Sequence, residues 1–307
     1  MKKLFIVLTL LASSMVPAHA ETPQAIVIID NGANTALFGD RVAYEVCILT
    51  SYKCPNGKTT MEGAGAAVLP PTTNKDFNHG TQMTSLVLRF NPTVKVIPIR
   101  IVGMTGLGNP GLYNLDDVQN ALNWVVANRE KFNIVAVSIS QGKVFPGCKV
   151  PAGMAPSIST LKSFNVPVMA AVGNDSNHAD VFSPACLPDA VSVGATDNPW
   201  PGMEPYEYDK NAAPYIARYS NGAQGQTDFF ANGRWNTTLI NGATKFSTGT
   251  SGATAAFAAW WVLNKKDTLL RLRNNSEFVS LVDCEMTGSS NVRGTLLRLE
   301  IRKLLFR

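Results

Sequence analysis

The chain has 307 residues, of which 45% are hydrophobic and 16% are charged, with 24 glycines and 18 prolines. This balance is typical of a large globular domain, and it excludes a disordered, collagenous or coiled-coil protein. The net charge is +5, from 27 Lys and Arg against 22 Asp and Glu. So small a surplus does not indicate nucleic acid as a partner.

The first 20 residues predict a secretory signal peptide. Residues 2 and 3 are lysines, an apolar run covers residues 4–12, and residues 18–20 read Ala-His-Ala, as at a cleavage site. The alternative is a buried N-terminal helix. We expect residues 1–20 to be the signal and residues 21–307 to form one exported domain, periplasmic or secreted. No later stretch reaches the roughly 18 uninterrupted apolar residues of a membrane helix, so we expect no membrane span.

Apolar runs alternate with amphipathic stretches along the rest of the chain. They cover residues 25–29, 83–88, 94–99, 118–126, 134–139, 158–164, 166–172 and 190–193. This pattern predicts strands that helices bury on both faces, and therefore an α/β doubly wound domain with a mostly parallel sheet flanked by helices. The clearest helix is predicted over residues 115–130, where apolar residues recur at helical spacing after Asn114, a candidate N-cap.

Polar residues that could take part in a reaction lie at the predicted ends of these elements. Asp30 closes the first strand in AIVIIDNG, where a carboxylate can orient an imidazole. His79 lies in NHGTQMTS, where a loop turns into a helix, and it is one of only two histidines after residue 20. The carboxyl edge of an open sheet is where such folds bind ligands. By themselves, Asp30 could be a turn residue and His79 a surface or core histidine.

Two further positions have the same character. Asn174 ends a buried strand in VPVMAAVGND, where its amide is a neutral donor; the alternative is an ordinary turn residue. Ser251 lies in STGTSGATAAF at the start of an alanine-rich helix, whose first N–H groups can stabilise a negative oxygen. The alternative is that Ser251 or Thr250 only caps that helix.

The segments IVIIDNG, HGT, AAVGND and GTSGA occur in the order and local contexts typical of the subtilisin-like serine proteases, or subtilases. The sequence resembles this family from about residue 25 to about residue 304. The resemblance implies that Ser251 is the nucleophile, that His79 is the general base and then acid, and that Asp30 holds the tautomer of His79. It implies that Asn174 completes an oxyanion hole with the backbone N–H of Ser251.

The resemblance also implies where a substrate binds. Ser138, Ile139 and Ser140 match the family strand that pairs with an extended polypeptide substrate. Residues Ala170, Ala171 and Gly173 match one wall of the pocket for the residue before the scissile bond. No cofactor is required, and no metal ligands are assigned. The family often binds structural calcium. This sequence has no dense acidic loop of the kind that calcium prefers, so we assign no calcium ligands and leave calcium binding open.

Some residues depart from the family pattern. Only residues 21–24 separate the predicted signal from the first strand, so we recognise no propeptide and expect that the domain folds unaided or that a separate inhibitor or regulatory protein restrains it. Asn31 stands where Thr or Ser is usual, Gly252 replaces a Met, Ala255 replaces a Pro and Ser140 replaces a Gly. We expect a monomer.

Export makes the five cysteines candidates for disulfide bonds. Cys148 follows the substrate-binding strand and Cys186 follows the strand that leads to Asn174, so we predict that these two pair. Cys47 and Cys54 fit a second bridge in a hairpin-like insertion. Cys284 is then the free thiol.

These observations lead to a serine endopeptidase that works through an Asp-His-Ser triad and an acyl-enzyme. The alternative is a catalytically weak or silent relative that binds peptides or a partner protein, which the departures above would favour. A sugar- or nucleotide-binding α/β protein has little support, because the glycine-rich turns at residues 63–65 and 103–111 do not fit a phosphate loop after a strand.

Overall fold

A computed structural model describes residues 22–69, 74–111, 114–197, 215–222 and 226–264, and the strand backbones of residues 277–280 and 293–296. The predicted signal peptide and Cys284 lie outside the described residues. Among the described residues, no helix combines the length and the apolar character needed to cross a membrane.

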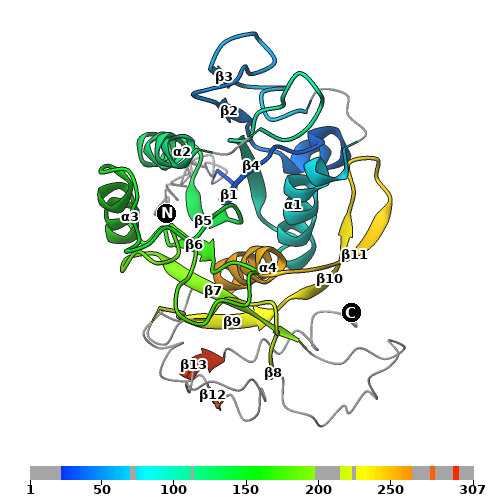
Figure 1. Cartoon of the computed structure of the whole chain (residues 1–307). Coiled ribbons are helices and arrows are strands. Elements are labelled where there is room, and N and C mark those ends of the chain that lie inside the picture. Colours follow the sequence, from blue (N-terminus) through cyan, green and yellow to red (C-terminus); the bar gives the residue numbers. More distant parts are fainter. Residues whose placement is uncertain are drawn as a thin grey trace, which may run out of the picture.

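Eight parallel strands, β13 (Arg293–Leu296) and the seven named next, form most of an eleven-stranded sheet (Figure 1). In spatial order these seven are β9 (Phe229–Asn232), β7 (Val191–Asp197), β6 (Val168–Ala171), β5 (Ile134–Ile139), β1 (Ala25–Asp30), β4 (Lys95–Arg100) and β2 (Val46–Ile48). Further strands extend this sheet: β3 (Thr60–Glu62) pairs with β2, β8 (Tyr215–Ile216) with β7, and β13 with β9 and β12 (Glu277–Ser280). The predicted mostly parallel sheet is confirmed.

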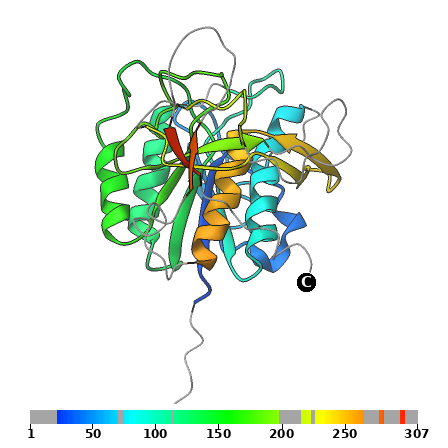
Figure 2. The same cartoon turned by 90° about the horizontal axis from the view of Figure 1, so that it is seen from below.

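In the part of the chain that the structure describes, four α-helices cover the two faces of the sheet (Figure 2). On one face, α1 (His79–Phe90) and α4 (Thr250–Leu263) pack on the side chains of Ile26 and Ile28. On the other, α2 (Leu115–Asn128) and α3 (Met154–Ser163) pack on Val27 and Ile29. Alternate residues of β1 point to opposite faces, so this strand is apolar from Ala25 to Ile29. The predicted helix from Leu115 is confirmed, and the side chain of Asn114 caps it by accepting from the N–H of Asp116 at 3.0 Å.

Smaller elements complete the domain. Three 3₁₀ helices cover Thr35–Leu37, Gly39–Arg41 and Lys75–Asn78, and the last of them leads directly into α1. An antiparallel ribbon of β10 (Arg234–Thr238) and β11 (Thr244–Thr248) lies beside α1 (Figure 1).

The order of the strands decides where a site can form. The chain places β4 on one side of β1 and β5 on the other, so the direction of winding reverses at β1. In open α/β sheets, the crevice outside the carboxyl ends of the strands at such a reversal is the usual ligand site. Asp30 is the last residue of β1 and therefore lies at this crevice.

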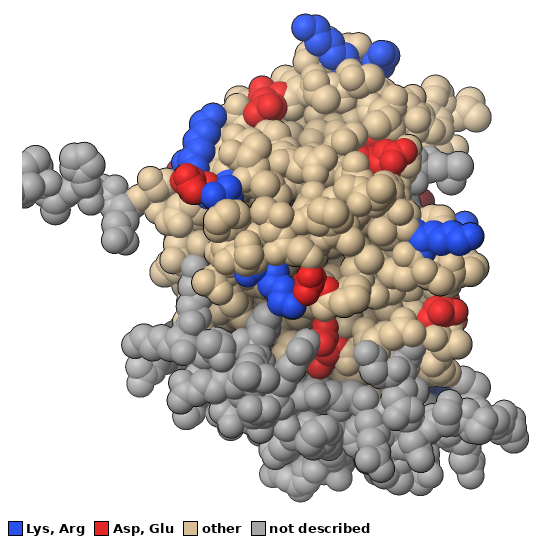
Figure 3. Space-filling model, turned by 90° about the vertical axis from the view of Figure 1, so that its left-hand side faces the viewer, with Lys and Arg blue, Asp and Glu red and all other residues tan. Residues whose placement is uncertain are grey.

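The structure joins the two cysteine pairs that the sequence predicts. Cys47 and Cys54 are bonded across the β2–β3 insertion with Cα atoms 5.9 Å apart, and Cys148 and Cys186 are bonded with Cα atoms 5.8 Å apart. The second bridge ties the loop after β5 to the loop after β6. Basic and acidic side chains are scattered over the face shown in Figure 3, without a large area of one sign.

Candidate active site

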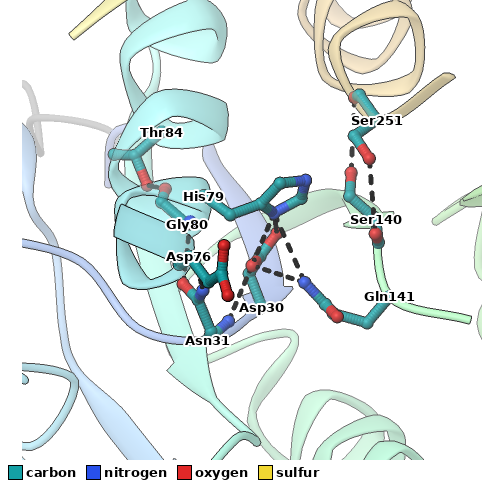
Figure 4. Close-up of polar contacts among 9 residues, drawn as sticks. All are labelled: Asp30, Asn31, Asp76, His79, Gly80, Thr84, Ser140, Gln141 and Ser251. Atoms are coloured by element: carbon teal, nitrogen blue, oxygen red, sulfur yellow. Dashed lines mark hydrogen bonds and ion pairs between the residues drawn. The ribbon is translucent and has the colours of Figure 1, made fainter. Parts of the chain in front are cut away.

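Asp30 and His79 are in direct contact at the carboxyl edge of β1 (Figure 4). Nδ1 of His79 lies 2.9 Å from both Oδ1 and Oδ2 of Asp30. The side chain of Asp30 is 2% exposed, whereas that of His79 is 29% exposed. A buried carboxylate therefore holds one nitrogen of an imidazole whose other nitrogen is on the side of the ring that faces Ser251 (Figure 4).

The end of β1 and the start of α1 are held together closely. The side chain of Asn31 donates to the carbonyl of Asp76 at 2.7 Å and accepts from the N–H of Gly80 at 2.9 Å. A Cβ atom on Gly80 would lie 1.9 Å from the carbonyl oxygen of Gly32, so only glycine fits here. Asn31, a departure from the family pattern, thus fixes His79 relative to Asp30.

The environment of His79 favours its charged form. Burial of the imidazole lowers the pKa of His79, whereas the charge of Asp30 and the hydrogen bond to it raise the pKa. The contributions of Asp30 prevail, and the pKa of His79 lies above the ordinary histidine value. His79 can therefore hold a proton in mildly acidic solution and lose it as the pH rises.

Ser251 is in the first turn of α4 and is 8% exposed. Its hydroxyl donates to the carbonyl of Ser140 at 3.4 Å, and the hydroxyl of Ser140 donates to the carbonyl of Ser251 at 3.3 Å (Figure 4). In this structure the hydroxyl of Ser251 is thus directed to Ser140 and not to His79. Both Ser251 and His79 line the same cavities.

Asn174 follows β6 and faces the start of α4. Its side-chain oxygen accepts from the N–H of Thr250 at 2.9 Å and from the hydroxyl of Thr250 at 3.0 Å. With the oxygen occupied in this way, the amide nitrogen is directed away from Thr250. Because Asn174 lines the cavities next to Ser251, its N–H groups can donate to a ligand there.

Two cavities meet at these residues. One, of about 370 Å³, lies between α1 and the β10–β11 ribbon and includes Met83, Trp235 and Phe246 in its walls. The other, of about 570 Å³, lies at the carboxyl ends of the strands and includes Gly142 and Phe182. His79, Asn174 and Ser251 line both cavities. A chain that passes through this cleft would place one of its bonds beside Ser251.

The structure changes the prediction for the substrate-binding strand. Ser138 and Ile139 belong to β5, where they pair with β1 on one side and with β6 on the other. A strand paired on both sides has no free edge for a peptide, so a substrate-binding role of these two residues stays a prediction. Ser140 has left the strand and lines the 570 Å³ cavity together with Gln141 and Gly142. The candidate substrate segment is thus residues 140–142.

The predicted pocket wall lies outside the lining of the two cavities, and its role stays a prediction. Ala170 and Ala171 are buried in β6, and neither they nor Gly173 line the two cavities described above. The ring of Phe182 covers this wall: a Cβ atom on Gly173 would lie 2.5 Å from it, and one on Gly142 would lie 2.9 Å from it. Phe182 therefore fills the space between Gly142 and Gly173, and it lines the cavity together with Gly142.

Gly252 follows the candidate nucleophile where the family usually has a methionine. A Cβ atom at this position would lie 3.0 Å from Cδ1 of Trp235. The indole of Trp235 thus occupies the space of the missing side chain, and its N–H donates to the carbonyl of Asn232 at 2.6 Å. The departure at Gly252 is compensated by a large neighbour from β10.

The remaining predictions concern histidine and metals. His178 is exposed and does not line either cavity, so His79 is the histidine of this site. Within the described ranges, His, Cys, Asp and Glu side chains form no group that could hold a metal ion. Structural calcium stays an untested expectation.

Sequence reasoning missed Gln141. Its side-chain nitrogen donates to Oδ1 of Asp30 at 2.9 Å (Figure 4). The signal that identified Asp30 and Asn174, a polar residue just beyond the end of a buried strand, is also present at Gln141, two residues after β5. Asn31 and Phe182 were also missed, because their roles depend on contacts between distant segments.

Comparison with known proteins agrees with this architecture. The sequence profile of the Subtilase family matches residues 24–271. The chain belongs to the subtilase family.

Curated relatives are distant. An "extracellular serine proteinase" of Thermus sp. (strain Rt41A) is 26% identical over 212 residues, which are 64% of this chain and 45% of that protein. "Subtilisin-like protease 3" of Pseudogymnoascus destructans (strain ATCC MYA-4855 / 20631-21) is 28% identical over 139 residues, which are 43% of this chain and 32% of that protein. The chain thus spans less than half the length of these relatives.

Solved structures share the fold. An S41 psychrophilic protease has a TM-score of 0.63 at 16% identity, with 88% of this chain and 89% of that chain covered. Sphericase has a TM-score of 0.61 at 18% identity, with 83% and 82% covered. At such identities the likeness establishes the subtilisin-like fold alone.

Proposed function

We propose that the protein is an exported serine endopeptidase that cleaves polypeptides through Asp30, His79 and Ser251. The observation that carries the proposal is the contact of buried Asp30 with Nδ1 of His79 at 2.9 Å, at the edge of a cleft that Ser251 also lines. A serine hydroxyl is a weak nucleophile until a neighbouring base removes its proton, and His79 is the base within this cleft. Family membership supports the same chemistry.

In the proposed reaction, the hydroxyl of Ser251 leaves the carbonyl of Ser140 and turns to Nε2 of His79. As Oγ attacks the substrate carbonyl carbon, His79 takes the proton, and the charge on the carbonyl oxygen is stabilised by the amide of Asn174 and the N–H of Ser251. His79 then protonates the leaving amine as the C–N bond breaks, which leaves an acyl-enzyme. Water hydrolyses the ester by the same steps in reverse order, and Asp30 holds the proton on Nδ1 throughout.

The cleft suits an extended polypeptide. The segment 140–142 offers backbone groups at the edge of β5 to the part of a substrate that precedes the scissile bond. The cavity between α1 and the ribbon would take the part that follows it. We place the protein outside the cytoplasm because of the predicted signal peptide, which the name of the Thermus relative supports. We propose a monomer that either folds unaided or is restrained by a separate inhibitor or regulatory protein.

A second candidate function is that of a silent relative that binds peptides without cleaving them. The observation in its favour is the contact of the Ser251 hydroxyl with Ser140, which leaves Ser251 turned away from the base. The two functions differ in the reactivity of Ser251, since a fluorophosphonate modifies only an activated serine.

The deciding experiment is fluorophosphonate labelling together with hydrolysis of casein. We expect labelling of Ser251 in the wild-type protein, and neither labelling nor hydrolysis in Ser251→Ala. The matched control is Ser159→Ala, which removes a surface hydroxyl on α3 that bonds Asp189. Folded wild-type protein that is neither labelled nor active would favour the silent relative, and normal proteolysis by Ser251→Ala would refute the assignment.

A further inference from the structure

Gln141 extends the Asp30–His79 contact to a third side chain. It follows β5 by two residues, and β5 is the neighbour of β1, with Ile139 opposite Ile29. Its amide reaches back over the sheet edge and donates to Oδ1 of Asp30 at 2.9 Å (Figure 4). The three side chains therefore come from three elements that meet at the reversal point of the sheet.

Three donors converge on the carboxylate of Asp30. Oδ1 accepts from the N–H of Asn31 at 2.7 Å and from Gln141, while Nδ1 of His79 lies 2.9 Å from both oxygens. Nε2 of Gln141 and Nδ1 of His79 are only 3.3 Å apart, as expected when two donors converge on one acceptor. The opposite orientation of the amide would bring its oxygen against a carboxylate oxygen, so the N–H group must face Asp30.

This arrangement has two consequences for His79. Two donors on Oδ1 fix the rotation of the carboxylate, and because the side chain of Asp30 is 2% exposed, water cannot easily replace a lost donor. A donor to the carboxylate also takes up part of its negative charge, which weakens its attraction for an imidazolium. The other charged groups around the cavity are Lys75 and Asp76, which precede α1, and Lys245 on β11.

We propose that Gln141 is a positioning residue of the catalytic unit, which holds Asp30 in one rotation and limits how strongly the carboxylate stabilises the charged form of His79. The proposal rests on the proposed function, because it assigns Gln141 to the same reaction. It goes beyond the triad, since a two-residue Asp–His contact would need no third side chain on the carboxylate.

Two substitutions test the proposal against a merely structural role. Gln141→Met keeps the size of the side chain but removes the donor, and Gln141→Glu places a second carboxylate against Asp30. We expect kcat to fall about ten-fold in Gln141→Met with little change in KM, because one hydrogen bond to a charged group is lost. The control is Gln119→Met on α2, whose side-chain oxygen accepts from the N–H of Gly153 at 2.8 Å, far along the chain from the triad.

The pH dependence of kcat/KM distinguishes the two roles, because a merely structural role of Gln141 would leave its midpoint unchanged. Without the donor, His79 should stay protonated to a higher pH, and a second negative charge should increase this effect. We expect the midpoint of the kcat/KM profile to rise from wild type to Gln141→Met and again to Gln141→Glu, with Gln119→Met unchanged. Equal midpoints in folded Gln141 variants would overturn the proposal.

A measurement without catalysis separates this proposal from the proposed function. In a Ser251→Ala background, the imidazole of His79 can be titrated by NMR and assigned with His178→Gln. The same order of midpoints is expected whether or not the wild-type protein cleaves peptides, and equal midpoints would overturn the role of Gln141 alone. Absence of wild-type activity with the expected order would instead overturn the proposed function.

Discussion

Replacing Asp30 by asparagine tests how the carboxylate sets the proton position on His79. An asparagine has the same shape, but one oxygen becomes an NH₂ group. At the position of Oδ1, the N–H of Asn31 at 2.7 Å and Nε2 of Gln141 at 2.9 Å both require an acceptor. The amide oxygen is therefore held there, and the NH₂ group takes the position of Oδ2, 2.9 Å from Nδ1 of His79.

Nδ1 would then face an NH₂ group on one side and, on the other, an amide oxygen that already accepts from two donors, so we expect the imidazole to accept at Nδ1 and carry its proton on Nε2. That nitrogen then faces Ser251 as a donor and cannot take the proton of its hydroxyl. Such a change of tautomer lowers kcat about ten-thousand-fold in triad proteases, which corresponds to roughly 5 kcal/mol of transition-state stabilisation. We expect this loss in Asp30→Asn, with a KM close to that of the wild type.

The assay combines peptide hydrolysis with ¹⁵N NMR of the imidazole, which reports which nitrogen bears the proton. The control is Asp189→Asn, at a surface carboxylate that pairs with Lys162 at 2.5 Å and lies outside the cleft. Turnover by folded Asp30→Asn within ten-fold of wild type, or a proton still on Nδ1, would refute the reasoning.

Four further predictions follow from the site and the disulfides. Asn174→Ala should lower kcat by about a hundred- to a thousand-fold with little effect on KM, because its amide is needed when charge develops on the substrate oxygen; steady-state kinetics that show a raised KM and an intact kcat would contradict this role. Activity should rise with pH through the titration of His79, whose pKa lies above the ordinary histidine value, because the base must be neutral; a flat kcat/KM profile from about pH 5 to pH 8 would count against it. Replacing both Cys148 and Cys186 by serine should lower the free energy of unfolding, measured with urea, by about 3–4 kcal/mol, since their bridge closes a loop between residues 38 positions apart. Peptide mapping under non-reducing conditions that joins either cysteine to another partner would contradict the pairing. Phe182→Ala should open the space between Gly142 and Gly173. In a series of peptides, we expect kcat/KM for a substrate with a large residue before the scissile bond to rise about ten-fold relative to a substrate with alanine there. An unchanged preference would show that the pocket lies elsewhere.

The sequence by itself determined the features that depend on local pattern. The apolar run before Asp30 and the helical spacing after Asn114 were sufficient to predict a buried strand and a capped helix, because burial on two faces and capping are short-range requirements. In parallel strands the carboxyl ends share one edge of the sheet, so polar residues that follow such strands, including Asp30 and Asn174, could be predicted to lie near one another.

Only the tertiary structure decided where each strand stops pairing with its neighbours and which side chains from distant segments come into contact. Residues 140–142 follow β5 and line the cavity, whereas Ser138 and Ile139 stay paired with both β1 and β6. The contacts of Gln141 with Asp30 and of Ser251 with Ser140 each join residues 111 positions apart. No local pattern encodes them, since they exist only once the sheet has placed separate strand ends within hydrogen-bond distance.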